Sequence, residues 1–178
     1  MATSCPLTTG FAYECDETTG GIKAGSLLIT QWENVTATTV LAGEITALTQ
    51  AATTEFFRYS IKKEMVDFNG TMNHDPALGS YYVEDILTAA LINLSKEKNV
   101  ELKLLAGKPL FIIVQDLNDV YHGFGLQSGA EQIGTTRSSG KEYGTMNGYN
   151  LSFTAKDTNW YTVGSSVVAG LVVNGEAT

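Results

Sequence analysis

The sequence predicts a mainly β fold, an antiparallel β-sandwich or barrel with one short α-helix. Threonine, glycine and aromatic residues are plentiful while proline occurs only three times, and this composition favours strands over helices. Several segments alternate apolar and polar side chains with a period of two, and residues 110–115 form an unbroken apolar run typical of a buried strand. Clusters of turn-forming residues separate these segments.

The size of the chain predicts one domain over residues 1–178. Apolar residues make up 43 % of the sequence and charged residues 17 %, which is enough apolar material for a core and too little charge for a disordered chain. Residues 1–21 hold two turn clusters and are expected to form an extended N-terminal segment. Residues 158–178 are expected to end the chain as a C-terminal arm.

The first half of the chain is expected to consist mainly of strands. Residues 26–32 and 40–49 read as strands on either side of a turn at residues 34–39, and residues 55–68 are the clearest early strand. Residues 81–94 are rich in Ala, Leu and Ile, which favours a helix, but their apolar side chains also alternate. We favour a long strand that pairs back onto residues 55–68 and keep the helix as the alternative.

One helix is predicted over residues 96–106. Ser95 is a good N-cap, and an acidic residue follows in the first turn, where the helix dipole favours a carboxylate. Val100, Leu104 and Leu105 are expected to face the core.

The second half of the chain is expected to contain a hairpin and further strands. Residues 110–115 and 120–126 form the hairpin around a turn at residues 116–119, and residues 127–145 are a polar loop with a weak strand near Ile133.

A strong Asn147-Gly148 turn signal precedes a clean alternation over residues 149–156. Residues 160–163 and 167–173 are expected to be the last strands.

Charge and segment composition limit the class of partner. The formal net charge of −8 argues against a nucleic-acid-binding groove, which needs clustered Lys and Arg. No run of about 18 apolar residues predicts a membrane span, and the N-terminus lacks the features of a signal peptide. Synthesis in the cytoplasm is therefore expected, where Cys5 and Cys15 favour two buried thiols, with a disulfide as the alternative.

The titratable residues do not predict an enzyme, a cofactor or a metal site. His74 and His122 lack a nucleophile pattern nearby, so each is expected to be an ordinary loop or strand residue. Asp116, Asn118 and Asp119 carry oxygen ligands, but their spacing lacks the glycine and distal glutamate of a calcium loop, so a hairpin turn is expected.

Two segments resemble tailed-phage virion proteins, especially those of Bacteroidetes phages. They are Tyr143-Gly-Thr-Met-Asn-Gly-Tyr-Asn-Leu-Ser-Phe-Thr-Ala-Lys-Asp157, and Cys15-Asp16 with Gly20-Gly21-Ile22-Lys23 and Asn34-Val35-Thr36-Ala37. The order of the expected elements over residues 11–157 looks most like a tail tube subunit, or major tail protein. The resemblance implies rings of six copies that stack into a hollow tube, with strands that close a β-barrel around the lumen.

The resemblance also implies location and partners. The protein would be assembled in the host cytoplasm into the tail of a virion, and its partners would be itself and other tail proteins such as sheath, terminator or baseplate. Genomic DNA would pass through the lumen without specific binding, which the acidic balance of the chain suits. A long loop at residues 69–80 would contact the neighbouring ring. The residues expected in this contact are Asn69, Met72, His74, Asp75 and Leu78.

Two other readings stay open at this point. One is another virion component, such as a head decoration, a tail terminator or a capsid-associated protein, and tube formation would separate it from a tube subunit. The other is a β-sandwich that binds a small ligand or carbohydrate, for which Trp32 and Trp160 are the obvious aromatic candidates.

Overall fold

The computed structural model describes residues 19–174, so Cys5, Cys15 and most of the predicted N-terminal segment lie outside the described residues. The fold is mainly β, as predicted. The strands are β1 (Leu27–Gln31), β2 (Val35–Leu41), β3 (Glu44–Gln50), β4 (Phe56–Tyr59), β5 (Val66–Asp75), β6 (Ser80–Ile92), β7 (Leu110–Gln115), β8 (Tyr121–Phe124), β9 (Ala130–Ser138), β10 (Gly148–Asp157), β11 (Tyr161–Val163) and β12 (Val173–Asn174). The helices are η1 (Trp32–Asn34), α1 (Lys96–Leu105) and α2 (Ser165–Ala169).

The strands form one forked sheet whose branch point is β7. One edge of β7 pairs with β1, and its other edge pairs with β9 at Leu110 and with β8 from Ile112 onward. The fork creates two layers. One layer runs β12-β4-β1-β7-β8-β11-β3-β2, and the other is the four-stranded layer β9-β10-β6-β5. Most pairs are antiparallel, but β11 pairs with β3 and β12 pairs with β4 in parallel.

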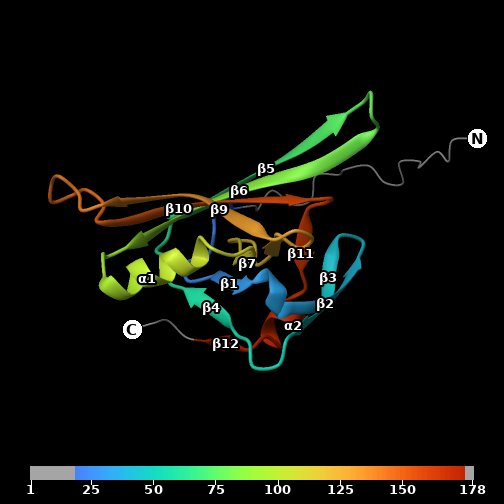
Figure 1. The fold of residues 1–178 in the computed structure, drawn as a ribbon, viewed down its shortest axis with the longest axis horizontal. Coiled ribbons are helices and arrows are strands. Elements are labelled where there is room, and N and C mark those ends of the chain that lie inside the picture. The colour runs from blue at the N-terminus through green and yellow to red at the C-terminus, as the bar shows by residue number, and fades with distance from the viewer. Residues whose placement is uncertain (1–18, 175–178) are drawn as a thin grey trace, which may run out of the picture.

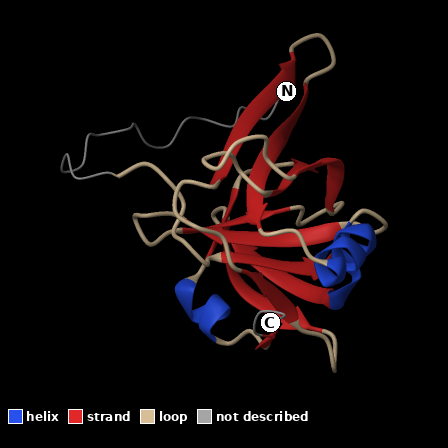
Figure 2. Cartoon of the chain, turned by 90° about the vertical axis from the view of Figure 1, so that its left-hand side faces the viewer, coloured by secondary structure: helices blue, strands red, loops and turns tan. Residues whose placement is uncertain are grey.

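The central pair β1 and β7 is buried on both faces, which explains the unbroken apolar run in the sequence. Alternate side chains of these two strands enter two different cores. The first core lies between this pair, the four-stranded layer and α1, and includes Leu27, Ile29, Leu110, Ile112, Val114, Leu87, Tyr149, Leu151 and Phe153. The second lies on the opposite face, toward β3, β11 and α2, and includes Leu28, Ile45, Phe56, Phe111, Ile113, Tyr161 and Val163. Accordingly, α1 and α2 lie on opposite sides of the strands (Figure 2).

Helix α1 begins where the sequence predicts, but it buries a different face. The Ser95 hydroxyl accepts a hydrogen bond from the backbone N–H of Lys98 at 3.2 Å, which confirms the N-cap. Leu105 is buried as expected, together with Leu102. The prediction that Val100 and Leu104 face the core is wrong, because these side chains are 58 % and 62 % exposed.

The predicted loop at residues 69–80 is instead the far part of a long β-hairpin. Strands β5 and β6 pair without interruption from Val66↔Ala89 to Asp75↔Ser80. The hairpin projects from the body of the molecule (Figures 1 and 2). The long-strand interpretation of residues 81–94 is confirmed by β6, but its partner is Val66–Asp75 rather than residues 55–68, and its other edge pairs with β10.

Two other early predictions need correction. The predicted turn at residues 34–39 lies largely within β2, which forms a hairpin with β3 through Ala42 and Gly43. The single strand predicted over residues 55–68 is divided into β4 and the start of β5, and Ile61 is buried between them in the first core.

The later predictions are confirmed for β8, β10, β11 and the turn at residues 116–119, and wrong at two places. Residues 127–145 contain the nine-residue strand β9 rather than a loop with a weak strand. Residues 167–173 contain most of α2 rather than a strand. Up to Asn174, the expected C-terminal arm packs against the second core through Val167, Val168, Leu171 and Val173.

Candidate functional site

The four-stranded layer has open edges on both sides. The inner edge of β5 pairs with β6, and within residues 19–174 its outer edge has no strand partner. Strand β9 pairs with β10 along its length, whereas in the described part of the chain its outer edge contacts another strand only where Ala130 meets Leu110. Unpaired N–H and C=O groups along an edge are a template for pairing with another chain. The layer is therefore suited to extension from both sides.

One face of this layer is turned to solvent, and we call it the outer face. Cross-strand partners point to the same side of a sheet, so the register of the four strands identifies its residues. Apart from the projecting end of the hairpin, it is made of Asp67, Asn69 and Thr71 of β5, Glu84, Ile86, Thr88 and Ala90 of β6, Asn150, Ser152, Thr154 and Lys156 of β10, and Glu131, Gly134 and Thr136 of β9. Three carboxylates face one ammonium group, and that ammonium lies 3.6 Å from Glu84. The outer face is thus polar and mildly acidic.

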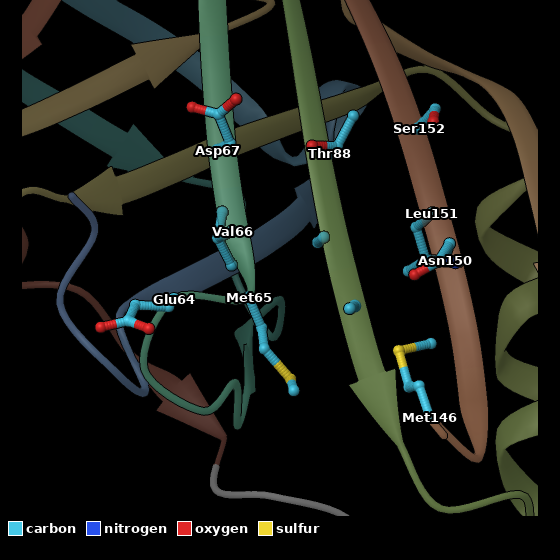
Figure 3. A pocket seen from close by; sticks show the side chains of 11 residues that line it. Glu64, Met65, Val66, Asp67, Thr88, Met146, Asn150, Leu151 and Ser152 are labelled. Carbon is cyan, nitrogen blue, oxygen red and sulfur yellow. The ribbon is translucent and has the colours of Figure 1, made fainter. Parts of the chain in front are cut away.

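A shallow groove of about 500 Å³ crosses the outer face where β5 begins and β6 ends. Its floor is formed by small side chains of β6, including Ala90, and polar side chains of β10 form one wall. Met65 and Met146 lie on either side of β6 at the end of the groove (Figure 3). Glu64 and Asp67, which are both solvent-exposed, also line the groove.

The five residues expected in a subunit contact all lie on the β5–β6 hairpin, but they do not form one cluster. Asn69 is on the outer face, whereas Met72 and His74 are on the opposite face of β5. Asp75 shapes the turn, since its carboxylate accepts hydrogen bonds from the N–H groups of Ala77 and Leu78 at 2.9 and 3.3 Å. Leu78 is 79 % exposed at the tip.

A second cavity lies at the base of the hairpin, on the side opposite to the outer face, and we call it the base pocket. It encloses about 340 Å³. The pocket is lined by Phe68 and Gly70 of β5, Asp85 of β6, His122, Gly123 and Phe124 of β8, and Trp160, Tyr161 and Thr162 near β11. Most of the wall is aromatic. Asp85 is the only acidic residue of the lining, and it is 4 % exposed.

The carboxylate of Asp85 lies directly over Gly70. A Cβ atom at position 70 would come within 2.3 Å of Asp85 Oδ1 and 2.5 Å of Trp160 Nε1. Trp160 Nε1 donates a hydrogen bond to the same oxygen at 3.1 Å. Because glycine has no side chain here, the Asp85 carboxylate of β6 can lie over the backbone of β5.

The electrostatic environment of Asp85 disfavours its charged form. Burial is the main reason that the pKa of its carboxyl is raised to about 6, and repulsion from Asp157 adds to this effect. The hydrogen bond from Trp160 and the charge of His122 act in the opposite direction without cancelling the shift. The pocket therefore holds a carboxylate with too little positive charge around it.

His122 is engaged by the turn at residues 116–119. Its Nε2 lies 3.2 Å from Asp116 Oδ2, while Asp116 Oδ1 accepts hydrogen bonds from the N–H groups of Asn118 and Val120 at 2.8 and 2.9 Å. These bonds lower the pKa of the Asp116 carboxyl despite its partial burial. The arrangement is the predicted hairpin turn. Within residues 19–174, no group of three His, Cys, Asp or Glu side chains is placed to hold a metal ion.

The two tryptophans suggested as ligand contacts do not share a pocket. Trp160 lines the base pocket, whereas Trp32 donates a hydrogen bond through Nε1 to the carbonyl oxygen of Leu126 at 2.9 Å. The remaining lining residues come from separate segments and carry no sequence motif. In the described part of the chain, no helix is long and apolar enough to cross a membrane.

Comparison with known proteins gives a distant likeness at the level of structure. No protein-family model matches the sequence, and no curated protein matches it. Among solved structures, the chain is similar to a chain described as "Virion of native gene transfer agent (GTA) particle", with a TM-score of 0.39 and 6 % identity. The match covers 60 % of this chain and 89 % of the other. A likeness at this level carries no argument about function.

Proposed function

We propose that this chain is a structural virion protein that assembles into stacked hexameric rings and forms the tail tube of a phage. The observation that carries this proposal is the four-stranded layer with two open edges, at β5 and at β9. The resemblance of residues 143–157 to tailed-phage virion proteins supports the same assignment. The expected partners are further copies of the chain and other tail proteins.

The strand directions suit closure into a ring. Every pair within the layer is antiparallel, so β9 runs antiparallel to β5. When a rotation about a ring axis brings β9 of one copy beside β5 of the next, the antiparallel pattern continues across the contact. A closed barrel of such layers leaves no open edge, which removes the risk of uncontrolled pairing.

The outer face is the surface that would line the lumen in this arrangement. Its side chains are mostly hydroxyls and amides, and its carboxylates outnumber its single ammonium. DNA carries dense negative charge, so such a surface repels it weakly and offers few cations to hold it. A conduit needs this property, because DNA must move through it without binding.

The first prediction is that the purified protein assembles. Sedimentation velocity at micromolar concentration should show species far above the 19.1 kDa monomer, and negative-stain microscopy should show rings or tubes of uniform width. Closed rings that never stack would instead favour another virion component, such as a tail terminator. A monomer at every concentration, with and without a nucleating tail protein, would contradict the proposal.

The second prediction concerns the projecting hairpin, which we propose contacts the next ring. Replacing residues 73–82 with Asn-Gly joins Met72 to Val83, which already lie opposite each other. The subunit should stay folded by circular dichroism, because the deleted residues are outside both cores. Rings should still form, but stacking should be lost. Normal tubes from this variant, seen by electron microscopy, would refute the contact.

A further inference from the structure

We propose that the base pocket binds the guanidinium group of Arg137 from a neighbouring copy of this chain, with Asp85 as its carboxylate partner. The proposal rests on the proposed function, because it requires β9 of one copy to lie beside β5 of the next. It adds the residues that recognise each other across the contact.

The face of the sheet on which Arg137 lies is the first argument. Arg137 is paired with Tyr149 of β10, and Tyr149 is paired with Leu91 of β6. Cross-strand partners share a face, so Arg137 lies on the core side of the layer rather than on the outer face. Phe68, Gly70 and Asp85 are on this same side. Other core-side residues on β9, such as Gln132 and Thr135, are uncharged.

The lengths of the two edge strands give the register. Strand β5 has ten residues and β9 has nine. Antiparallel pairing over nearly their full length, with faces matched over residues 134–138 beyond the bulge in β9, places Arg137 opposite Phe68 and Thr136 opposite Asn69. Arg137 is then one strand spacing, about 4.8 Å, from β5 and one diagonal step from Gly70, over which the Asp85 carboxylate lies. An extended arginine side chain spans that distance.

The chemistry of the pocket fits a guanidinium group. A buried carboxylate is costly unless it is paired, and within residues 19–174 the one hydrogen-bond donor bound to the Asp85 carboxylate is the neutral indole N–H of Trp160. A guanidinium supplies charge and several donors in a planar fork, and its flat faces pack against aromatic rings such as Phe68 and Trp160. The Arg137 side chain is exposed and forms no ion pair with any carboxylate of residues 19–174. The Asp85 carboxylate lacks a cation, and the Arg137 guanidinium can supply one.

The test compares charge-removing variants of the full-length protein. Arg137→Gln and Asp85→Asn should each raise the concentration for half-maximal assembly by at least about tenfold, measured by sedimentation velocity. The Asp85→Asn side chain still accepts the Trp160 hydrogen bond. Lys141→Gln removes the same charge from the connection between β9 and β10 and should shift assembly by less than about twofold. The double variant should be little weaker than either single one, because both remove the same interaction.

A disulfide cross-link tests the register independently. In a background with Cys5→Ser and Cys15→Ser, oxidation of a variant with Asn69→Cys and Thr136→Cys should give a ladder of covalent oligomers on a non-reducing gel. Within one copy, β5 and β9 are separated by two strands, about 14 Å, which is too far for a disulfide. A variant with Thr71→Cys and Thr136→Cys is displaced by two residues and should give no ladder.

The outcomes separate this inference from the proposed function. If the parent protein forms rings and Arg137→Gln assembles like Lys141→Gln, the pairing of Arg137 with Asp85 is wrong while ring formation stands. A ladder from the displaced cysteine pair, without one from the proposed pair, also overturns the inference. If the parent protein never assembles, both proposals fall.

Discussion

Replacing Asp157 with alanine is expected to lower the free energy of unfolding by about 3 kcal/mol, because several backbone donors lose their acceptor at once. Asp157 is 4 % exposed at the end of β10. Its carboxylate accepts hydrogen bonds from the N–H groups of Gly125, Leu126 and Gln127 at 2.9, 3.3 and 2.9 Å. These residues form the connection at which the chain leaves β8 and begins β9. Asp157 therefore fixes the fork between the two layers.

Urea unfolding, performed at a concentration too low for assembly, measures this effect. Asp157→Asn keeps one acceptor oxygen and should lose less stability than Asp157→Ala. Asp67→Ala, which removes an exposed carboxylate from β5, should change stability by less than about 0.5 kcal/mol and serves as the control. Equal losses for Asp157→Ala and Asp67→Ala would show that the carboxylate does not hold the fork.

The elements that the sequence predicts well are those whose environment leaves a local pattern. Strand β7 is buried on both faces and reads as an unbroken apolar run, while β10 has one buried face and alternates. Strand β9 could not be found in this way, because its residues beyond Ala130 are mostly exposed on both faces. The far part of the β5–β6 hairpin has the same exposure and was therefore predicted as a loop. A projecting strand has no core to impose a period on its sequence.

Tertiary packing also decides features that local patterns misplace. Val167 and Val168 are β-branched and favour a strand by propensity, yet they lie in α2, where they pack against the second core. The base pocket was outside the reach of sequence reasoning for a related reason. Gly70, Asp85, His122 and Trp160 come from separate segments, and only the hairpin and the β8–β11 pairing bring them together. Of these four residues, the sequence points only to Trp160 as a candidate ligand contact.

Asp85 is expected to make the isolated subunit less stable at neutral pH than in mildly acidic solution. Its pKa is about 6 in the folded state, mainly because of burial, against 3.8 for the ordinary carboxyl. The proton is therefore bound more tightly by the folded chain, and ionisation of Asp85 above pH 6 costs stability. The groups that face it are His122, Asp157 and the Trp160 indole, whose effects the raised pKa already includes. The cost is on the order of 2 kcal/mol at pH 7.5 and disappears as the pH falls from about 6 to about 4.

The Asp85→Asn variant isolates this contribution, because it keeps the acceptor for Trp160 and removes the charge. At pH 7.5 the variant should exceed the parent in free energy of unfolding by on the order of 2 kcal/mol, and at pH 4 the two should be equal. Asp67→Asn should follow the parent within about 0.5 kcal/mol. A pH-independent difference between Asp85→Asn and the parent would mean that folding does not raise the pKa of Asp85. If the Asp85 carboxylate only stabilised the fold, Asp85→Asn would lower the stability of the subunit. If it binds arginine as proposed, Asp85→Asn should raise the stability of the monomer and weaken assembly.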